Sequence, residues 1–286
     1  MVDIDRIYNM DCIDGFKLLD DNSIDLVVTS PPYDNLRTYN GYSFDFESVA
    51  KELYRVLKST GVVVWIVSDA TIDGSETLTS FKQALYFKEI GFKVNDTMIW
   101  QKPTFTAVGA LKYRYAQVFE YMFILTKGSN YTFNPIKDHK NVEFGKFHKA
   151  GSVRQIDGSV RKMSKDHLHS EFSIRFNVWK NNAVISNVER SGHPAQFPED
   201  LICDHIISWS NEDDIVLDPF MGSGTTAVAC MRTNLHYIGF EVSKEYVDIA
   251  NTRIEKFCDT VDKRYKSIDD RTGKLMVYQK SKLFNL

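Results

Sequence analysis

The chain has 286 residues, of which 43% are hydrophobic and 26% are charged, and its net charge is −3. This composition excludes an intrinsically disordered chain and suits one larger α/β domain, with or without an insertion. No run reaches the roughly 20 apolar residues of a membrane span, and the first residues do not resemble a signal peptide, so we expect a cytoplasmic protein. The four cysteines form no Cys-x-x-Cys pair, which argues against a zinc site and a disulfide framework.

The first half of the chain alternates between apolar runs typical of strands and amphipathic stretches typical of helices. The expected strands are 24–28 and 62–67, and the expected helices are 46–57 and 78–90. Two further runs, 92–100 and 118–125, have no helical pattern between them, which predicts an antiparallel pair at one edge of the sheet. Alternating helices and strands predict a doubly wound α/β sheet.

The alternation of predicted strands and helices ends at about residue 128. Residues 128–190 are poor in aliphatic residues, and we expect an irregular insert there. Residues 127–190 carry 12 Lys or Arg and 6 Asp or Glu, a net charge of +6, so the rest of the chain carries −9. A basic segment in an acidic protein is the expected footprint of a polyanion site, although charged runs are usually solvated surfaces. The α/β pattern resumes with a helix at 198–209 and continues to about residue 257; residues 259–286 form a C-terminal extension.

The first motif is Thr29-Ser30-Pro31-Pro32-Tyr33, which directly follows the buried strand 24–28. Because both prolines lack an N–H and have a fixed φ, neither a strand nor a helix continues through them. A rigid turn at the carboxyl end of a strand is where open α/β sheets bind their ligands. The hydroxyl of Ser30, free backbone carbonyls and the ring of Tyr33 suit a flat, hydrogen-bonding ring such as a nucleobase. The alternative is a purely structural Pro-Pro turn.

The second motif lies almost two hundred residues later and consists of a strand, a glycine-rich turn and a helix. The strand 215–217 leads into Asp218-Pro219-Phe220-Met221-Gly222-Ser223-Gly224-Thr225-Thr226, and residues 227–231 indicate a helix. A further strand, 237–240, ends at Glu241, about 20 residues beyond the glycines, where an acid commonly binds ribose hydroxyls. These features predict a nucleotide-like ligand, and the strand ending at Leu217 should lie beside the strand ending at Val28.

The residues of the glycine-rich turn also narrow the chemical identity of the ligand. No Lys follows Gly224, so the turn is not a phosphate-binding P-loop, and Ala227 fills the third glycine position of the dinucleotide fingerprint. S-adenosylmethionine (SAM) has an adenine and a ribose but no phosphate, and Asp218 could counter its positive charge. A nicotinamide-dependent oxidoreductase remains an alternative, although it does not explain the Ser-Pro-Pro-Tyr turn.

Both motifs resemble those of the DNA amino-methyltransferases. Residues 218–226 resemble the SAM-binding motif of that family, and Thr29–Tyr33 resemble its catalytic motif. With the catalytic motif first and the cofactor motif last, the chain resembles the β class of these enzymes over roughly residues 5–255. The resemblance implies a Rossmann-like, circularly permuted sheet with an inserted irregular target-recognition region. It divides the chain into a catalytic half (1–127), a target-recognition insert (128–190), a SAM-binding half (191–258) and the extension 259–286.

The resemblance also assigns roles to individual residues. Ser30, Pro31, Pro32 and Tyr33 would be catalytic. The SAM-binding set would be Asp11, Cys12, His193, Pro194, Asp218, Pro219, Phe220, Gly222, Ser223, Gly224, Thr225 and Glu241. Apart from the resemblance, the loop after the catalytic turn and the basic segment are expected to contact double-stranded DNA through Arg37, Lys146, Lys149, Arg154, Arg161 and Lys162.

The implied reaction transfers a methyl group from SAM to the exocyclic amine of a base that has been flipped out of the duplex. Tyr33 would stack on the base, while Ser30 Oγ and the Pro31 carbonyl accept hydrogen bonds from the amine. No metal and no covalent enzyme intermediate are needed. Family members with Ser at the position of Ser30 resemble cytosine-N4 methyltransferases, so we favour cytosine N4 over adenine N6. A non-catalytic DNA-binding protein, a cognate restriction endonuclease as partner and a homodimer also remain open.

Overall fold

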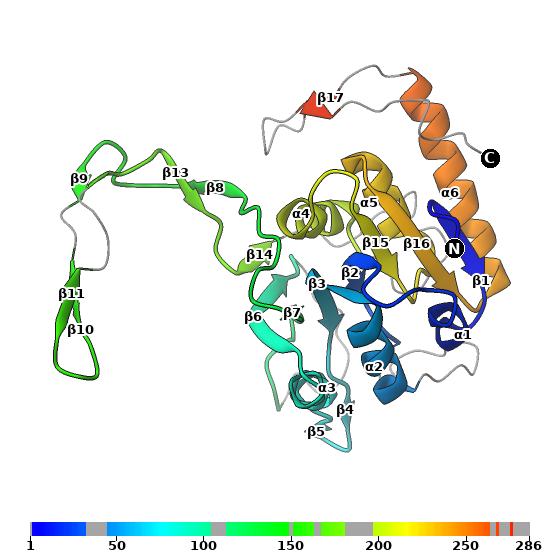
Figure 1. The fold of residues 1–286 in the computed structure, drawn as a ribbon, viewed down its shortest axis with the longest axis horizontal. Helices are drawn as coiled ribbons and strands as arrows, with labels where there is room; N and C mark the ends of the chain where they lie inside the picture. Colours follow the sequence, from blue (N-terminus) through cyan, green and yellow to red (C-terminus); the bar gives the residue numbers. More distant parts are fainter. Residues whose placement is uncertain are drawn as a thin grey trace. The chain divides into compact units, whose positions relative to one another are not determined.

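An eight-stranded mixed sheet forms the centre of the fold (Figure 1). The computed structural model describes residues 2–32, 45–103, 113–148, 151–162, 167–180, 197–263, 267–268 and 275–276. The chain divides into two units: Met1–Asn134 with Asn177–Leu286, which contains the sheet, and Pro135–Phe176.

The strands of the central sheet run in the order β1-β16-β15-β2-β3-β7-β6-β14. Their bounds are β1 Arg6–Asn9, β2 Ile24–Thr29, β3 Leu57–Val67, β6 Lys93–Gln101, β7 Phe119–Thr126, β14 Val178–Lys180, β15 Ile215–Asp218 and β16 His236–Glu241. The five strands from β1 to β3 are mutually parallel, β7 is antiparallel to both of its neighbours, and β14 is parallel to β6.

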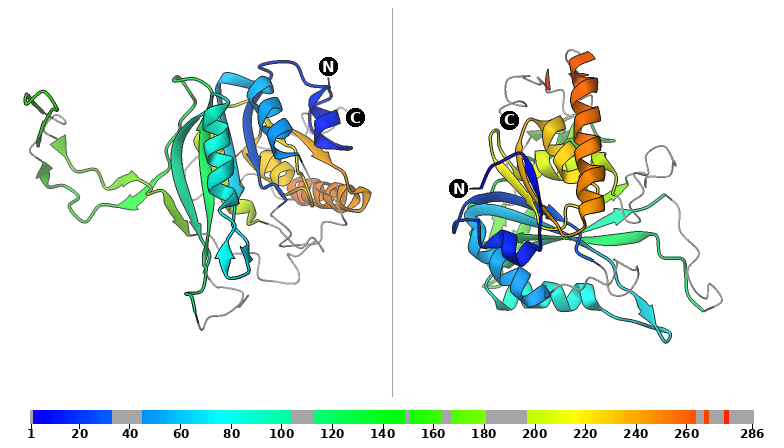
Figure 2. Two further views of the ribbon diagram at one scale, coloured as in Figure 1. Left: turned by 90° about the horizontal axis from the view of Figure 1, so that it is seen from below. Right: turned by 90° about the vertical axis from the view of Figure 1, so that its right-hand side faces the viewer.

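Helices cover both faces of this sheet. Their bounds are α1 Cys12–Phe16, α2 Phe46–Val56, α3 Thr79–Glu89, α4 Glu199–Trp209, α5 Thr225–Thr233 and α6 Lys244–Lys263. The right-hand view of Figure 2 shows the blue-to-cyan helices on one side of the sheet and the yellow-to-orange helices on the other. Within the described ranges, no helix is both long and apolar enough to cross a bilayer.

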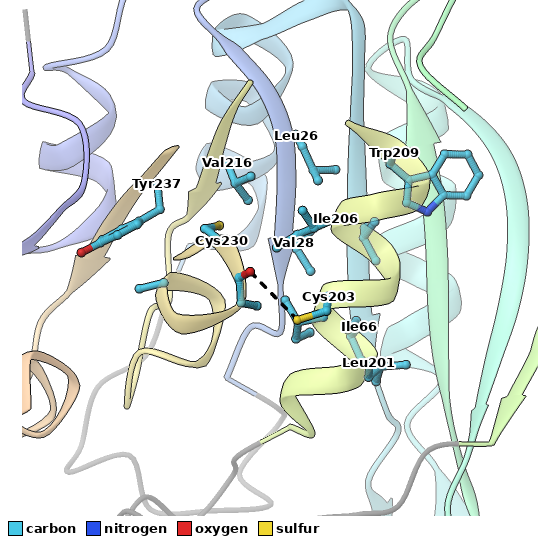
Figure 3. Close-up of a cluster of buried hydrophobic side chains, with 14 of the residues drawn as sticks. Leu26, Val28, Ile66, Leu201, Cys203, Ile206, Trp209, Val216, Cys230 and Tyr237 are labelled. Carbon is cyan, nitrogen blue, oxygen red and sulfur yellow. Dashed lines mark hydrogen bonds between the residues drawn. The ribbon is translucent and has the colours of Figure 1, made fainter. Parts of the chain in front are cut away.

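Successive residues of the parallel strands point to opposite faces and enter two separate cores. Leu26 and Val28 of β2 pack with residues of α4 and α5, such as Ile206 (Figure 3), whereas Val27 packs with residues of α1 and α2, such as Phe16. Because both faces are buried, these strands are continuous apolar runs rather than alternating ones.

The predicted doubly wound fold is confirmed, and so is the adjacency of the two motif-bearing strands, because Leu217 of β15 pairs with Val27 of β2. The antiparallel pairing of β6 with β7 is also confirmed. Its placement at the sheet edge was wrong, since β14 adds a further strand beside β6. The sequence analysis missed β1 and α1, which are only four and five residues long.

Within the insert that was expected to be irregular, the unit Pro135–Phe176 contains a ribbon of short antiparallel strand pairs. Three nested strand pairs build it: β8 Lys137–Lys140 with β13 Phe172–Ile174, β9 Phe147–His148 with β12 His167–Leu168, and β10 Ser152–Arg154 with β11 Val160–Lys162. Two short hairpins lie elsewhere: β4 Thr71–Ile72 with β5 Ser75–Glu76, and β17 Ser267–Ile268 with β18 Leu275–Met276.

Candidate active site

The carboxyl ends of four neighbouring parallel strands form the candidate site. In sheet order, these strands end at Asn9, Glu241, Asp218 and Thr29. Asn9 pairs with Glu241, and Asp218 pairs with Gly239 one strand further along. The edge therefore brings together three segments that the sequence analysis selected separately: the one after β1, the Pro-Pro turn after β2 and the glycine-rich turn after β15.

Asp218 links the Pro-Pro turn to the glycine-rich turn. Thr29 Oγ1 donates to Asp218 Oδ1 at 2.7 Å, and Thr226 Oγ1 donates to Asp218 Oδ2 at 2.6 Å. The backbone N–H of Phe220 also donates to Oδ1, at 3.1 Å. Burial raises the pKa of this carboxyl to about 6, although the three donors oppose the shift.

This geometry corrects the expectation that Asp218 counters the charge of the ligand. The side chain is only 1% exposed, and both of its oxygens accept hydrogen bonds from residues of the fold. Asp218 therefore holds the two turns together instead of facing a ligand.

The two glycines of the turn have backbone conformations that other residues rarely adopt. Gly222 has φ +53° and Gly224 has φ +82°. At Gly224, which caps α5, a Cβ atom would lie 2.8 Å from the Cβ of Ala250 on α6. Close packing of α6 against the turn therefore requires glycine at this position.

Glu241 lies across from the turn with its carboxylate held in place by two backbone amides. Gly222 N donates to Oε2 at 2.9 Å, and Ser243 N donates to Oε1 at 2.8 Å. Burial raises the pKa of this half-buried carboxyl above its usual range. Asn9 Nδ2 donates to the carbonyls of Glu241 and Val242, both at 3.0 Å, and so fixes the backbone. Since each carboxylate oxygen has two lone pairs, Glu241 can still accept hydrogen bonds from a ligand hydroxyl.

The segment after β1 places Asp11 and Cys12 at the same edge. The Asp11 carboxylate caps α1 by accepting a hydrogen bond from Ile13 N at 2.8 Å. Burial, together with the charge of Asp11, raises the pKa of the Cys12 thiol to about 12, so this side chain remains a neutral, inert surface. Among the described residues, no three His, Cys, Asp or Glu side chains come together as metal ligands.

The Pro-Pro turn is described as far as Pro32. It directly follows β2, at the edge of the sheet that forms the site. Ser30 and Pro32 are half-buried and Pro31 is buried. Several predicted site residues lie outside the described residues: Tyr33, Arg37, Lys149, His193 and Pro194. The predicted DNA contacts Lys146, Arg154, Arg161 and Lys162 belong to the unit Pro135–Phe176.

Arg253 of α6 supports the glycine-rich turn, and the sequence analysis missed it. Its Nη1 donates to Ser223 O at 2.6 Å, to Ser223 Oγ at 3.1 Å and to Thr225 Oγ1 at 3.2 Å. Its Nη2 donates to Glu199 Oε1 at the start of α4, at 2.6 Å. Arg232 of α5 also pairs with Glu199, at 3.5 Å, and with Asp200, at 3.1 Å. A single Arg in an amphipathic helix, 30 residues from the turn, gave no sequence signal for this role.

Comparison with known proteins agrees with this geometry. A family model described as DNA methylase (N6_N4_Mtase) matches residues 24–252. The chain is 54% identical over 242 residues to the orphan methyltransferase M.BamHII of Bacillus amyloliquefaciens, covering 83% of this chain and 91% of the relative. It is 28% identical to the DNA adenine methyltransferase YhdJ of Escherichia coli, covering 87% and 82% of the two chains. The solved structure of an M1.HpyAVI–SAM complex superposes with a TM-score of 0.58 at 26% identity, covering 87% of this chain and 98% of that one.

The first prediction concerns the buried carboxyl of Asp218. Its pKa is raised from 3.8 to about 6 in the folded protein, so between these values the folded state keeps a proton that the unfolded chain has released. Stability must then fall as the pH rises through this window. Asn does not titrate, so the stability advantage of the wild type over Asp218→Asn should shrink between pH 4.5 and 8. Thermal unfolding of both proteins across this range measures it, and parallel curves would contradict the assignment.

The second prediction separates Arg253 from its neighbour Arg232. Arg253→Met removes three hydrogen bonds to the glycine-rich turn, and we expect it to weaken SAM binding about tenfold, equivalent to roughly 1.4 kcal/mol. Arg232→Met is the matched control, because it also removes an Arg that pairs with Glu199, and with Asp200, but from α5 instead of α6. Titration calorimetry with SAM measures both affinities. An equal loss of affinity in the two variants would show that the effect is not specific to the turn.

Proposed function

Because the chain belongs to the DNA methylase family of N6-adenine and N4-cytosine amino-methyltransferases, we propose that it methylates cytosine N4 in double-stranded DNA. The observation that carries the methyl-transfer part of this proposal is the hydrogen-bonded link Thr29–Asp218–Thr226. It joins the turn expected to hold the base to the turn expected to hold the cofactor. The alternative of a nicotinamide-dependent oxidoreductase is not supported, because the family uses SAM.

The residues expected to bind SAM would contact different parts of the cofactor. Glu241, held by two backbone amides, would accept hydrogen bonds from the ribose hydroxyls. Gly222 and Gly224 let the backbone of the turn approach the ligand closely, because they have no side chain. Asp11 and Cys12 would lie near the adenine, as the family resemblance implies, with His193 and Pro194 over the cofactor. When bound, SAM supplies a methyl group on a positively charged sulfur.

The Pro-Pro turn would activate the target amine. The lone pair of an exocyclic amine is delocalised into the base, which makes the nitrogen a poor nucleophile. If its two N–H groups donate to Ser30 Oγ and the Pro31 carbonyl, a tetrahedral nitrogen with an available lone pair is favoured. Tyr33 would stack on the flipped base, a contact worth about 1–3 kcal/mol, which offsets the few kcal/mol that base flipping costs. Positioning and electrostatics therefore supply the catalysis.

Ser30 is the basis for proposing cytosine N4 rather than adenine N6. Family members that methylate adenine mostly carry Asp or Asn at this position, whereas this chain has a hydroxyl. The relative YhdJ, named as an adenine methyltransferase, keeps adenine N6 as the second candidate. The relative M.BamHII is named an orphan methyltransferase, which supports an enzyme without a cognate endonuclease.

The remaining assignments complete the proposal. Residues 1–127 and 191–258 would form the two halves of the methyltransferase domain, and residues 128–190 would supply target recognition. DNA contacts would come from Arg37, Lys146, Lys149, Arg154, Arg161 and Lys162.

The third prediction identifies the methylated base. Plasmid DNA is incubated with the protein and tritium-labelled SAM and then digested to nucleosides, which are separated by chromatography. We expect the label in N4-methylcytosine, because Ser30 stands at the amine-binding position. If the label appears only in N6-methyladenine, the target is adenine N6, the second candidate. If no base carries the label, the proposed activity is contradicted.

A further inference from the structure

The end of the ribbon Pro135–Phe176 is a hairpin with a well-defined turn, formed by β10, β11 and the residues between them. Gln155 N donates to Ser159 O at 2.7 Å, and Gly158 N donates to Gln155 O at 3.0 Å. Gly158 has φ +83°, which closes the turn. Asp157 accepts hydrogen bonds from Ser159 N at 2.9 Å and from Ser159 Oγ at 2.7 Å, so its charge is directed into the turn. Ile156 is left as the apolar side chain at the tip.

This hairpin exposes apolar side chains to an unusual degree. Every residue from 151 to 162 is exposed, and the relative exposure reaches 43% at Val153, 66% at Val160 and 109% at Ile156. A two-stranded hairpin buries no core of its own and is marginally stable in water. Val153 and Val160 lie on opposite faces of the hairpin and Ile156 lies at its tip, so these exposed apolar side chains suit a partner that encloses the hairpin on both sides.

The charges of the hairpin indicate the chemistry of that partner. Arg154, Arg161 and Lys162 are all exposed, and none has an ion-pair partner among the residues that the structure describes. Elsewhere in the same ribbon, Arg175 pairs with Asp138 and Lys146 pairs with Glu143 at 3.5 Å. Lys137 and Lys140 of β8 are also exposed and have no ion-pair partner among the described residues, so unpaired positive charge extends along the ribbon to its tip, where it fits a polyanion.

The strand register distributes this charge over both faces of the hairpin. Arg154 pairs with Val160 and Ser152 pairs with Lys162, so Arg154 and Lys162 lie on one face. Arg161, which pairs with Val153, lies on the other face. A ribbon with cations on both faces matches a groove with phosphates along both walls.

We propose that hairpin β10–β11 inserts into the major groove of duplex DNA, with Ile156 against the base edges. The major groove admits a two-stranded β-ribbon, and apolar side chains contact thymine methyl groups there. Arg154 and Lys162 contact the phosphates of one strand, and Arg161 contacts those of the other. This inference rests on the proposed function, because it assumes that the protein's partner is duplex DNA.

The fourth prediction tests this insertion by the salt dependence of DNA binding. The triple variant R154Q/R161Q/K162Q should reduce the slope of log affinity against log salt by about 2–3, since each lost phosphate contact removes roughly one unit. The matched control is K51Q/K82Q/K88Q, which removes the same charge from exposed positions on α2 and α3 and should leave the slope unchanged. Fluorescence anisotropy between 50 and 200 mM KCl, on a plasmid-derived duplex that the wild type methylates, measures all three proteins.

The variant Ile156→Ser tests the apolar contact separately. Ser is well accepted in a turn, so the hairpin should persist, and we expect about a tenfold loss of DNA affinity with the wild-type salt slope. SAM affinity should be unchanged in every variant, because no described cofactor contact involves the hairpin.

Equal salt slopes for the hairpin triple variant and the control would overturn the inference. So would an Ile156→Ser variant that binds DNA normally but changes the sedimentation behaviour of the protein, because the tip would then contact a protein partner. If the wild type methylates no duplex DNA at all, the proposed function itself fails, and this outcome is distinguishable from a failure of the hairpin alone.

Discussion

The buried carboxylate of Asp218 is the interaction on which the candidate site depends. It accepts hydrogen bonds from Thr29, 189 positions earlier in the chain, and from Thr226 at the start of α5. Taking a carboxyl out of water costs free energy unless donors compensate, and here the fold supplies three. The distance between the Pro-Pro turn and the glycine-rich turn is fixed by this contact and by the pairing of β2 with β15. A methyl donor and its acceptor need such a fixed separation, because transfer depends on positioning.

Around this link, the cofactor turn is supported from two directions. Glu241 holds it from the neighbouring strand through Gly222, and Arg253 holds it from α6 through Ser223 and Thr225. The same Arg253 reaches Glu199 at the start of α4. Groups that touch the ligand must be held rigidly by their surroundings, and these contacts provide that support.

Features with a local pattern could be predicted from the sequence, and features made by distant partners could not. The parallel strands were predictable because burial on both faces leaves continuous apolar runs. The neighbourhood of β2 and β15 followed from where such sheets bind ligands. Asp218 was selected from the sequence as a residue that faces the ligand, and its partners Thr29 and Thr226 became evident only in the fold. The ribbon escaped prediction because its strands are two to four residues long and lack the alternation that a buried face imposes.

The most direct test of the account is the behaviour of Ser30→Ala. Ser30 directly follows β2, beside the linked turns, and in the proposed reaction it acts on the base and not on the cofactor. SAM affinity should therefore remain at the wild-type value, while methyl transfer from labelled SAM to plasmid DNA falls by roughly 100-fold, the scale of losing one positioned hydrogen-bonding group. Transfer at the wild-type rate by a variant that binds SAM normally would contradict the central claim that this turn activates the target amine.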